Sequence, residues 1–226
     1  MNVYLNTFCP LGSSATGRAA SYLFNLPPYI EGSARREPDF QHARPCITGM
    51  VNPQLVKKLE EGDFVVYMAD DFRHAGKRIV AVLKVIGKMQ SHRSAASWYI
   101  NEEFPVPNNL MAFGTQPVSP HETFGDGNFS GLNGSNGLLP ESKYKKRAKE
   151  CPDVAICRIW RNQVHLYHPP LLRDKDMMRI FGRSLPKNCT VSGNAGWEGL
   201  QQFILSRPSR RAKKPVIEPF AFLLAR

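Results

Sequence analysis

The sequence has few acidic residues, few cysteines and no long hydrophobic run. Its 226 residues contain 19 Asp and Glu against 30 Lys and Arg. Five cysteines are an odd number, and none forms a C-x-x-C pair, so neither a disulfide framework nor a zinc knuckle is supported. The longest apolar stretches, residues 79–83 and 220–225, are far too short to cross a bilayer. No basic segment followed by a long apolar run opens the sequence. We therefore expect a soluble protein of the reducing cytoplasm, without a membrane partner.

Motifs for self-contained catalysis are also missing. Gly76-Lys77 and Gly87-Lys88 lack the spacing and the following Ser or Thr of a P-loop, and neither G-x-G-x-x-G before a helix nor G-x-S-x-G occurs. The six histidines are not spaced as metal ligands. We expect no metal and no cofactor, and favour a binding protein over an enzyme. Catalysis by a Ser, His or carboxylate group assembled only in the fold stays open.

Positive charge is abundant and clustered. The formal net charge is +11, and two runs, residues 143–149 and 207–214, each hold five Lys or Arg. Neutralising phosphates releases condensed counterions, so such runs favour a polyanionic partner. We expect backbone contacts from the middle of each run, at Lys145, Lys146, Arg147, Arg210 and Arg211. A solvated basic surface is the alternative.

Short β-rich runs alternate with helical signals, which predicts an α+β fold. The clearest strands are residues 64–68 and 78–86, both rich in β-branched types and bounded by turn residues. Residues 3–5 and 47–51 are shorter candidates. Residues 154–160 and 163–167 read as a hairpin turning at Arg161-Asn162.

Three segments carry helix signals. Asn52-Pro53 places proline at a first helical position, with Leu55, Val56 and Leu59 at helical spacing. Ser91 can cap a helix from His92 to about residue 101. Residues 197–206 follow a glycine-bearing turn.

Composition divides the chain into three parts. Residues 1–113 and 151–206 hold the strand and helix patterns and predict one domain. Residues 114–150 are Gly/Asn-rich and end in the first basic run, which predicts a flexible insertion. Residues 207–226 predict a basic C-terminal extension.

The segments around the two clearest strands resemble the PUA-like superfamily, which includes the EVE, ASCH and YTH domains. The resemblance rests on EGDFVVY at residues 61–67 followed by RIVAVLKV at residues 78–85. RREPDF at residues 35–40 and PCITG at residues 45–49 are similar to the nucleotide-modification-associated domains of the same superfamily. Together these motifs cover roughly residues 30–113.

This resemblance implies a small, strongly bent β-barrel with flanking helices and a pocket for a base or nucleotide. Members of these families bind RNA or modified DNA bases, and some ASCH proteins are hydrolases. The Gly/Asn-rich insertion and the long C-terminal part depart from the compact pattern.

Two functions follow as hypotheses, with a third alternative in which the protein is a structural or protein-interaction module whose basic tail contacts an acidic partner. In the first, the protein recognises a modified or extruded base in a nucleic acid, in a DNA or RNA modification context. Its base pocket would be lined by Thr48, Tyr67, Trp98 and Asn108, with Arg35 and Arg36 near phosphate. In the second, it is an enzyme on nucleotides or bases, a hydrolase or a base-modifying enzyme, with Glu37 and Asp39 as proton-transfer candidates.

Overall fold

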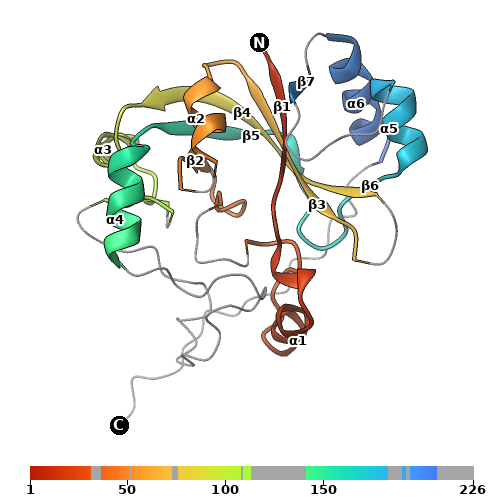
Figure 1. Ribbon diagram of the computed structural model, residues 1–226, viewed down its shortest axis with the longest axis horizontal. Coiled ribbons are helices and arrows are strands. Elements are labelled where there is room, and N and C mark those ends of the chain that lie inside the picture. Colours follow the sequence, from red (N-terminus) through yellow and green to blue (C-terminus); the bar gives the residue numbers. More distant parts are fainter. Residues whose placement is uncertain are drawn as a thin grey trace.

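A single curled sheet organises the molecule. The computed structural model describes residues 1–31, 37–50, 52–72, 76–107, 109–112, 141–182, 190–191 and 194–207. Within these residues the strands form one sheet in the order β2-β5-β4-β3-β1-β7, with β6 paired to β4. The sheet curls into a half-barrel with helices around it (Figure 1). The α+β class and the strong curvature expected from the sequence are confirmed.

The strands are β1 (Val3–Thr7), β2 (Cys46–Thr48), β3 (Phe64–Asp70), β4 (Lys77–Met89), β5 (Val154–Val164), β6 (Leu171–Leu172) and β7 (Thr190–Val191). The helices are the 3-10 turn η1 (Leu11–Ser13), α1 (Ala15–Leu23), α2 (Pro53–Lys58), α3 (His92–Asn101), α4 (Glu141–Glu150), α5 (Asp174–Phe181) and α6 (Asn194–Leu205). β1 runs parallel to β3, and the other described strand pairs are antiparallel. The sheet is therefore mixed.

The two strands predicted most clearly are its centre. β3 pairs with β4 along its whole length, and β4 also pairs with β5 and β6. Five residues from Ile79 to Leu83 are fully buried. Because β-branched and aromatic side chains pack well on a pleated surface, this segment suits a strand covered on both faces.

Side chains on the two faces of the sheet enter different cores. One face, here the α2 face, carries Tyr67 and Cys157 and packs against Leu55 and Val56 of α2. The opposite face, here the α6 face, has two covers. At one end α3 packs over Val154 and Ile156, and at the other end α5 and α6 pack over β1, β3 and β4. Alternation along β5 places both covers on the same side.

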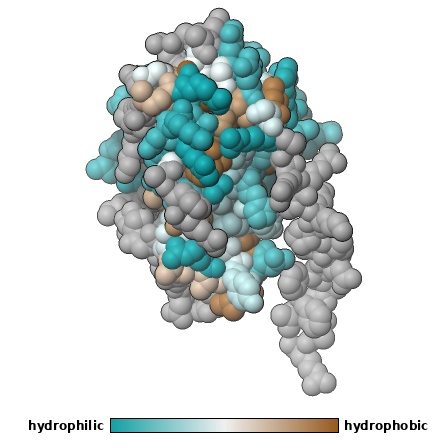
Figure 2. Space-filling model, turned by 90° about the vertical axis from the view of Figure 1, so that its right-hand side faces the viewer, coloured by the Kyte–Doolittle hydropathy of each residue, from teal (hydrophilic) through white to brown (hydrophobic). Residues whose placement is uncertain are grey.

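Hydrophobic residues are scattered over the surface near α5 and α6. Seen from that side, hydrophilic residues cover most of the described surface, with hydrophobic ones between them (Figure 2). Met178 and Leu205 are exposed there. Among the described helices, none combines the length and the apolar character that a membrane crossing requires.

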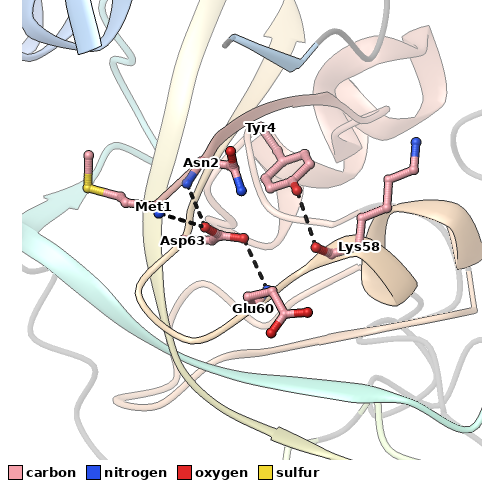
Figure 3. A network of polar contacts seen from close by, with 6 residues as sticks. All are labelled: Met1, Asn2, Tyr4, Lys58, Glu60 and Asp63. Atoms are coloured by element: carbon pink, nitrogen blue, oxygen red, sulfur yellow. Dashed lines mark hydrogen bonds and ion pairs between the residues drawn. The ribbon is translucent and has the colours of Figure 1, made fainter. Parts of the chain in front are cut away.

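The Gly-Asp turn before β3 has a structural reason for each residue. Gly62 has a φ of +89°, which glycine adopts without a Cβ penalty. The Asp63 side chain is 1% exposed; its Oδ1 accepts the Asn2 amide at 2.6 Å and its Oδ2 the Glu60 amide at 3.1 Å (Figure 3). Asp63 thereby ties the start of β1 to the turn that leads into β3.

The predicted hairpin at Arg161-Asn162 is wrong. Both residues have positive φ, 47° and 59°, as a tight hairpin turn requires. The chain nevertheless stays beside the same partner, because Ile159 pairs with Leu83 and Val164 with Ala81. The turn is thus a bulge inside β5, with extra residues looped out of the ladder.

Other elements agree with the sequence or shift from it. The helices at Pro53, His92 and the C-terminal part are confirmed, and Ser91 forms a capping box with Ser94. The strand expected at residues 47–51 is instead Cys46–Thr48. The basic run expected within a flexible insertion lies in helix α4, whereas residues 113–140 and the extension from 208 onward lie outside the described residues.

Candidate nucleic-acid interface

Tyr67 lies in the core of the α2 face. It is 1% exposed, and its ring meets Phe8 and Phe40 edge-on, with centroids 6.0 and 5.1 Å away. Phe8 and Phe40 contact each other in the same manner at 5.4 Å. Burial, and secondarily the charge of Glu37, raise the pKa of the Tyr67 hydroxyl. The ring thus packs within an aromatic triad, and its hydroxyl stays protonated.

The structure does not bring Thr48 and Tyr67 together. Thr48 is buried at the end of β2, where its register partner is Val154 of the α6 face. Directly opposed residues of an antiparallel pair point to the same side, so Thr48 faces away from the Tyr67 side of the sheet. Its Oγ1 accepts the Met50 amide at 3.4 Å. Asn108, Arg35, Arg36, Arg210 and Arg211 lie outside the described residues.

Trp98 belongs to a half-buried group at the C-terminal end of α3, here the α3 patch, which consists of Arg44, Trp98 and Phe104. The Trp98 and Phe104 rings are nearly parallel, at 15° with centroids 6.3 Å apart. The Arg44 guanidinium lies 5.1 Å from the Phe104 centroid. Flat rings beside a cation are what stacking with a nucleobase requires.

Hydrogen bonds fix the loop that carries Arg44. The Arg44 carbonyl accepts the Tyr99 hydroxyl at 2.8 Å. The Arg44 amide donates to His42 Nδ1 at 2.9 Å, so His42 Nε2 carries the proton and donates to the Pro105 carbonyl at 2.8 Å. These bonds join the segment before β2 to α3 and to the chain that follows it. The α3 patch therefore rests on a tethered scaffold.

Helix α4 places the first basic run at the same end of the sheet. Lys145, Lys146 and Lys149 are exposed, and Arg147 donates to the Met50 carbonyl at 3.1 Å, beside the end of β2. Lys146 also forms an exposed ion pair with Glu150 at 3.8 Å. Exposed pairs of this kind contribute little to stability and leave the lysine able to meet a phosphate.

The connection from α4 to β5 places the C-terminal end of α4 next to the start of β5, where α3 packs on the sheet. Residues 151–153 lead directly to Val154, which packs in one cluster with Ala95, Ala96 and Tyr99 of α3. Figure 1 shows both helices at this end of the sheet. Lys57, Lys58 and Lys88 are exposed nearby, and Lys88 Nζ donates to the Lys57 carbonyl at 3.0 Å. Cations from α2, β4 and α4 thus lie at one end of the sheet.

The two proton-transfer candidates differ in setting. Glu37 is 6% exposed and close enough to Tyr67 to act on the pKa of that phenol. Asp39 is half-buried, and its Oδ1 accepts the Gln41 amide at 3.0 Å, which makes a local turn. In the part of the chain that the structure describes, no group of three or more His, Cys, Asp or Glu could hold a metal ion.

Sequence reasoning missed Arg44 in the α3 patch and Trp160 on β5. Trp160 has an alternation signal, since it falls in phase with Val154 and Ile156. Arg44 has none, because its position depends on the loop contacts just described.

Comparison with known proteins gives no match. No family model matches the sequence, and neither a curated protein nor a solved structure matches it.

Proposed function

We propose that the protein binds nucleic acid and holds an unpaired or extruded base against the α3 patch. The observation that carries the proposal is the near-parallel, half-buried Trp98 and Phe104 pair with Arg44 over one ring. Base–aromatic stacking is worth about 1–3 kcal/mol per base and tolerates any base, because every base has a π-face. A modified base, in a DNA or RNA modification context, is the ligand that the resemblance to the nucleotide-modification-associated domains implies.

The basic helix supplies the second part of the proposal. Lys145, Lys146, Arg147 and Lys149 would contact the backbone of the same strand, which gives affinity without sequence information. Their position at the end of the sheet where α3 packs supports a shared interface. A PUA-like fold belongs to this proposal as well; the curled mixed sheet and the Gly62-Asp63 turn agree with it.

Anisotropy of a labelled single-stranded oligonucleotide, titrated at several salt concentrations, tests the base contact. We expect Trp98→Ala to weaken binding about tenfold or more, while Trp98→Phe retains most of it. Equal affinity of the wild type and Trp98→Ala would exclude Trp98 as the stacking residue.

The backbone contact has a matched control. Lys146→Ala/Lys149→Ala removes two exposed charges from α4, and Lys175→Ala/Arg179→Ala removes two from α5. We expect only the α4 pair to lower the salt slope, by about 0.7 for each phosphate contact to a single strand. A slope that changes equally in both variants would mean that net charge alone drives binding.

One observation favours a second candidate function, an enzyme on nucleotides or bases. Glu37 is a buried carboxyl whose charge, after burial, raises the pKa of the Tyr67 phenol, and buried groups with shifted pKa values are candidates for proton transfer. Incubation of nucleosides and oligonucleotides with the protein and with Glu37→Gln, followed by mass spectrometry, tests this alternative. Identical products from both proteins would exclude Glu37 as the catalytic group.

A further inference from the structure

A row of three residues crosses the α6 face between its two covers. Phe64 of β3 is the register partner of Lys84 on β4, which is in turn the partner of Arg158 on β5. Residues in such a row point to one side of the sheet. Toward α3 the next β5 residue on this face is Ile156, which is buried, whereas Lys84 is half-buried and Arg158 is exposed. Phe64 itself is buried against Trp197, so the part of the row that reaches solvent is a strip made of the two cations, Lys84 and Arg158.

Trp160 borders this strip. It is half-buried, and its ring contacts Phe64 at 6.2 Å and Trp197 of α6 at 5.4 Å, so two other rings hold it in position. The exposed Arg161 places its guanidinium 5.1 Å from the Trp160 centroid. An indole that is held by two other rings and still reaches solvent loses little entropy when a further ring stacks on it.

The bulge sets Arg161 apart from ordinary strand residues. Arg161 and Asn162 both have positive φ, a backbone conformation that is unfavourable for arginine. These residues lie in the part of β5 that is looped out of the ladder, and the Arg161 guanidinium lies over the Trp160 ring. A strained bulge beside a half-buried aromatic ring is a feature from which a function can be inferred.

Among the residues that the structure describes, no acidic side chain forms an ion pair with Lys84, Arg158 or Arg161. The ion pairs described are formed by other cations, among them Lys77, Arg78 and Lys146. Lys84 instead lies 5.7 Å from the Phe64 centroid. Three positive charges around one half-buried tryptophan therefore remain available to an anionic ligand.

We propose that Trp160, with Lys84, Arg158 and Arg161, is a second contact for single-stranded nucleic acid. This inference rests on the proposed function, and it adds that the nucleic acid is single-stranded. Unpaired bases can splay over a sheet face and stack on its aromatic side chains, whereas paired bases stack within their own helix. The cations of the strip would meet the phosphates on either side of the stacked base.

The test compares a labelled 12-nucleotide single strand, the duplex of the same sequence and a glutamate-rich peptide. We expect the wild type to prefer the single strand, and Trp160→Ala to weaken that binding about tenfold. We expect Arg158→Ala/Arg161→Ala to lower the salt slope by about 1.4, from two lost phosphate contacts. The matched control is Lys175→Ala/Arg179→Ala.

Two precautions keep the result interpretable. Trp160 packs against Phe64 and Trp197, so each variant is checked by thermal unfolding and near-ultraviolet circular dichroism. Arg158 and Arg161 are exposed, so their double variant keeps the core intact and decides the question if Trp160→Ala does not fold. Ultraviolet cross-linking, read by mass spectrometry, should also place the oligonucleotide on the peptide that contains Trp160.

The outcomes separate this inference from the proposed function. If Trp98→Ala loses binding but the Trp160 and Arg158/Arg161 variants bind like the wild type, the second contact is wrong and the proposed function stands. If the wild type binds neither nucleic acid, both fail. Preference for the duplex, or binding of the peptide at the strip in place of the oligonucleotide, also overturns the second contact.

Discussion

Asn109 and Cys46 hold each other through two hydrogen bonds. The Asn109 amide nitrogen donates to the Cys46 carbonyl at 2.9 Å, and its Oδ1 accepts from the Cys46 thiol at 3.1 Å. Both residues are completely buried. Burial raises the pKa of the thiol to about 12, although the hydrogen bonds with Tyr99 and Asn109 act in the opposite direction. Cys46 is therefore an uncharged structural thiol under the α3 patch.

We predict that Asn109→Ala destabilises the fold by about 1–3 kcal/mol. The substitution leaves the Cys46 carbonyl buried without this donor, and an unsatisfied buried polar group costs its desolvation energy. Urea unfolding measures the change, with the exposed Asn101→Ala as the control. A loss below about 0.5 kcal/mol, the range of ordinary surface substitutions, would contradict the prediction.

Gly62→Ala should destabilise the protein more than Gly87→Ala, because only Gly62 of these two has a positive φ. Gly62 has a φ of +89° and open space around a built Cβ, so Gly62→Ala introduces backbone strain alone, about 1–3 kcal/mol. Gly87 has no positive φ, and its Cβ would meet only the Met89 methyl at 3.9 Å. Chemical denaturation of Gly62→Ala and Gly87→Ala compares them. Equal destabilisation would show that space, not φ, selects glycine in the turn before β3.

Gly49→Ala should be rescued by a second substitution. A Cβ at Gly49 would lie 2.4 Å from the Cys151 Cβ, so the β2 end and the α4–β5 connection would have to separate, at about 1–3 kcal/mol. Replacing Cys151 by glycine removes the closest of these contacts. Thermal unfolding of both single variants and the double variant forms a mutant cycle. Strict additivity of the two effects would argue against the predicted contact.

Acid should destabilise the protein in part through His92. Its Nδ1 accepts the Met111 amide at 2.9 Å, and burial lowers the pKa of its imidazole from 6.5 to about 4. Between pH 6.5 and about pH 4, the His92 imidazole is therefore protonated in the unfolded chain and neutral in the folded protein. The contribution of neutral His92 to the free energy of unfolding is fully present above pH 6.5 and is lost as the pH falls toward 4. The loss is at most about 3 kcal/mol.

The variant His92→Asn isolates this contribution. An asparagine Oδ1 can still accept the Met111 amide but does not titrate. Burial also lowers the pKa of His165, so the difference between the two proteins, measured by urea unfolding from pH 4 to pH 7, is the informative quantity. A wild type and a variant with parallel pH profiles would exclude His92 as the source.

An element of the fold could be predicted from the sequence where neighbouring residues alone determine it. Ser91 and Asn52 mark helix starts through bonds to residues three positions ahead, so α3 and α2 were predictable from sequence. Arg161-Asn162 has the local conformation of a hairpin turn, but β4 is long enough to pair on both sides of it. Tertiary pairing therefore decided between a hairpin and a bulge. Helix α5 carried no signal that the sequence analysis used.

The candidate site was predictable only in part, because it depends on register. Which face Thr48 occupies follows from its partner Val154, and a bulge in β4 between Val85 and Gly87 shifts the phase relative to Tyr67. A single sequence reveals neither the pairing of Thr48 with Val154 nor the bulge in β4. Trp98 and the α4 lysines could be named in advance from residue type and clustered charge, although the helix that carries these lysines was not predicted. Their use by a ligand stays a prediction.

The order of strands has a consequence for synthesis on the ribosome. β4 is thirteen residues long and apolar, and its neighbour β5 begins only at Val154. Until that later segment emerges, one edge of β4 exposes unpaired amides and carbonyls to any other extended chain. Fragments that end before residue 154 should therefore aggregate during expression, and chaperones that shield nascent strands should raise the yield of the whole chain.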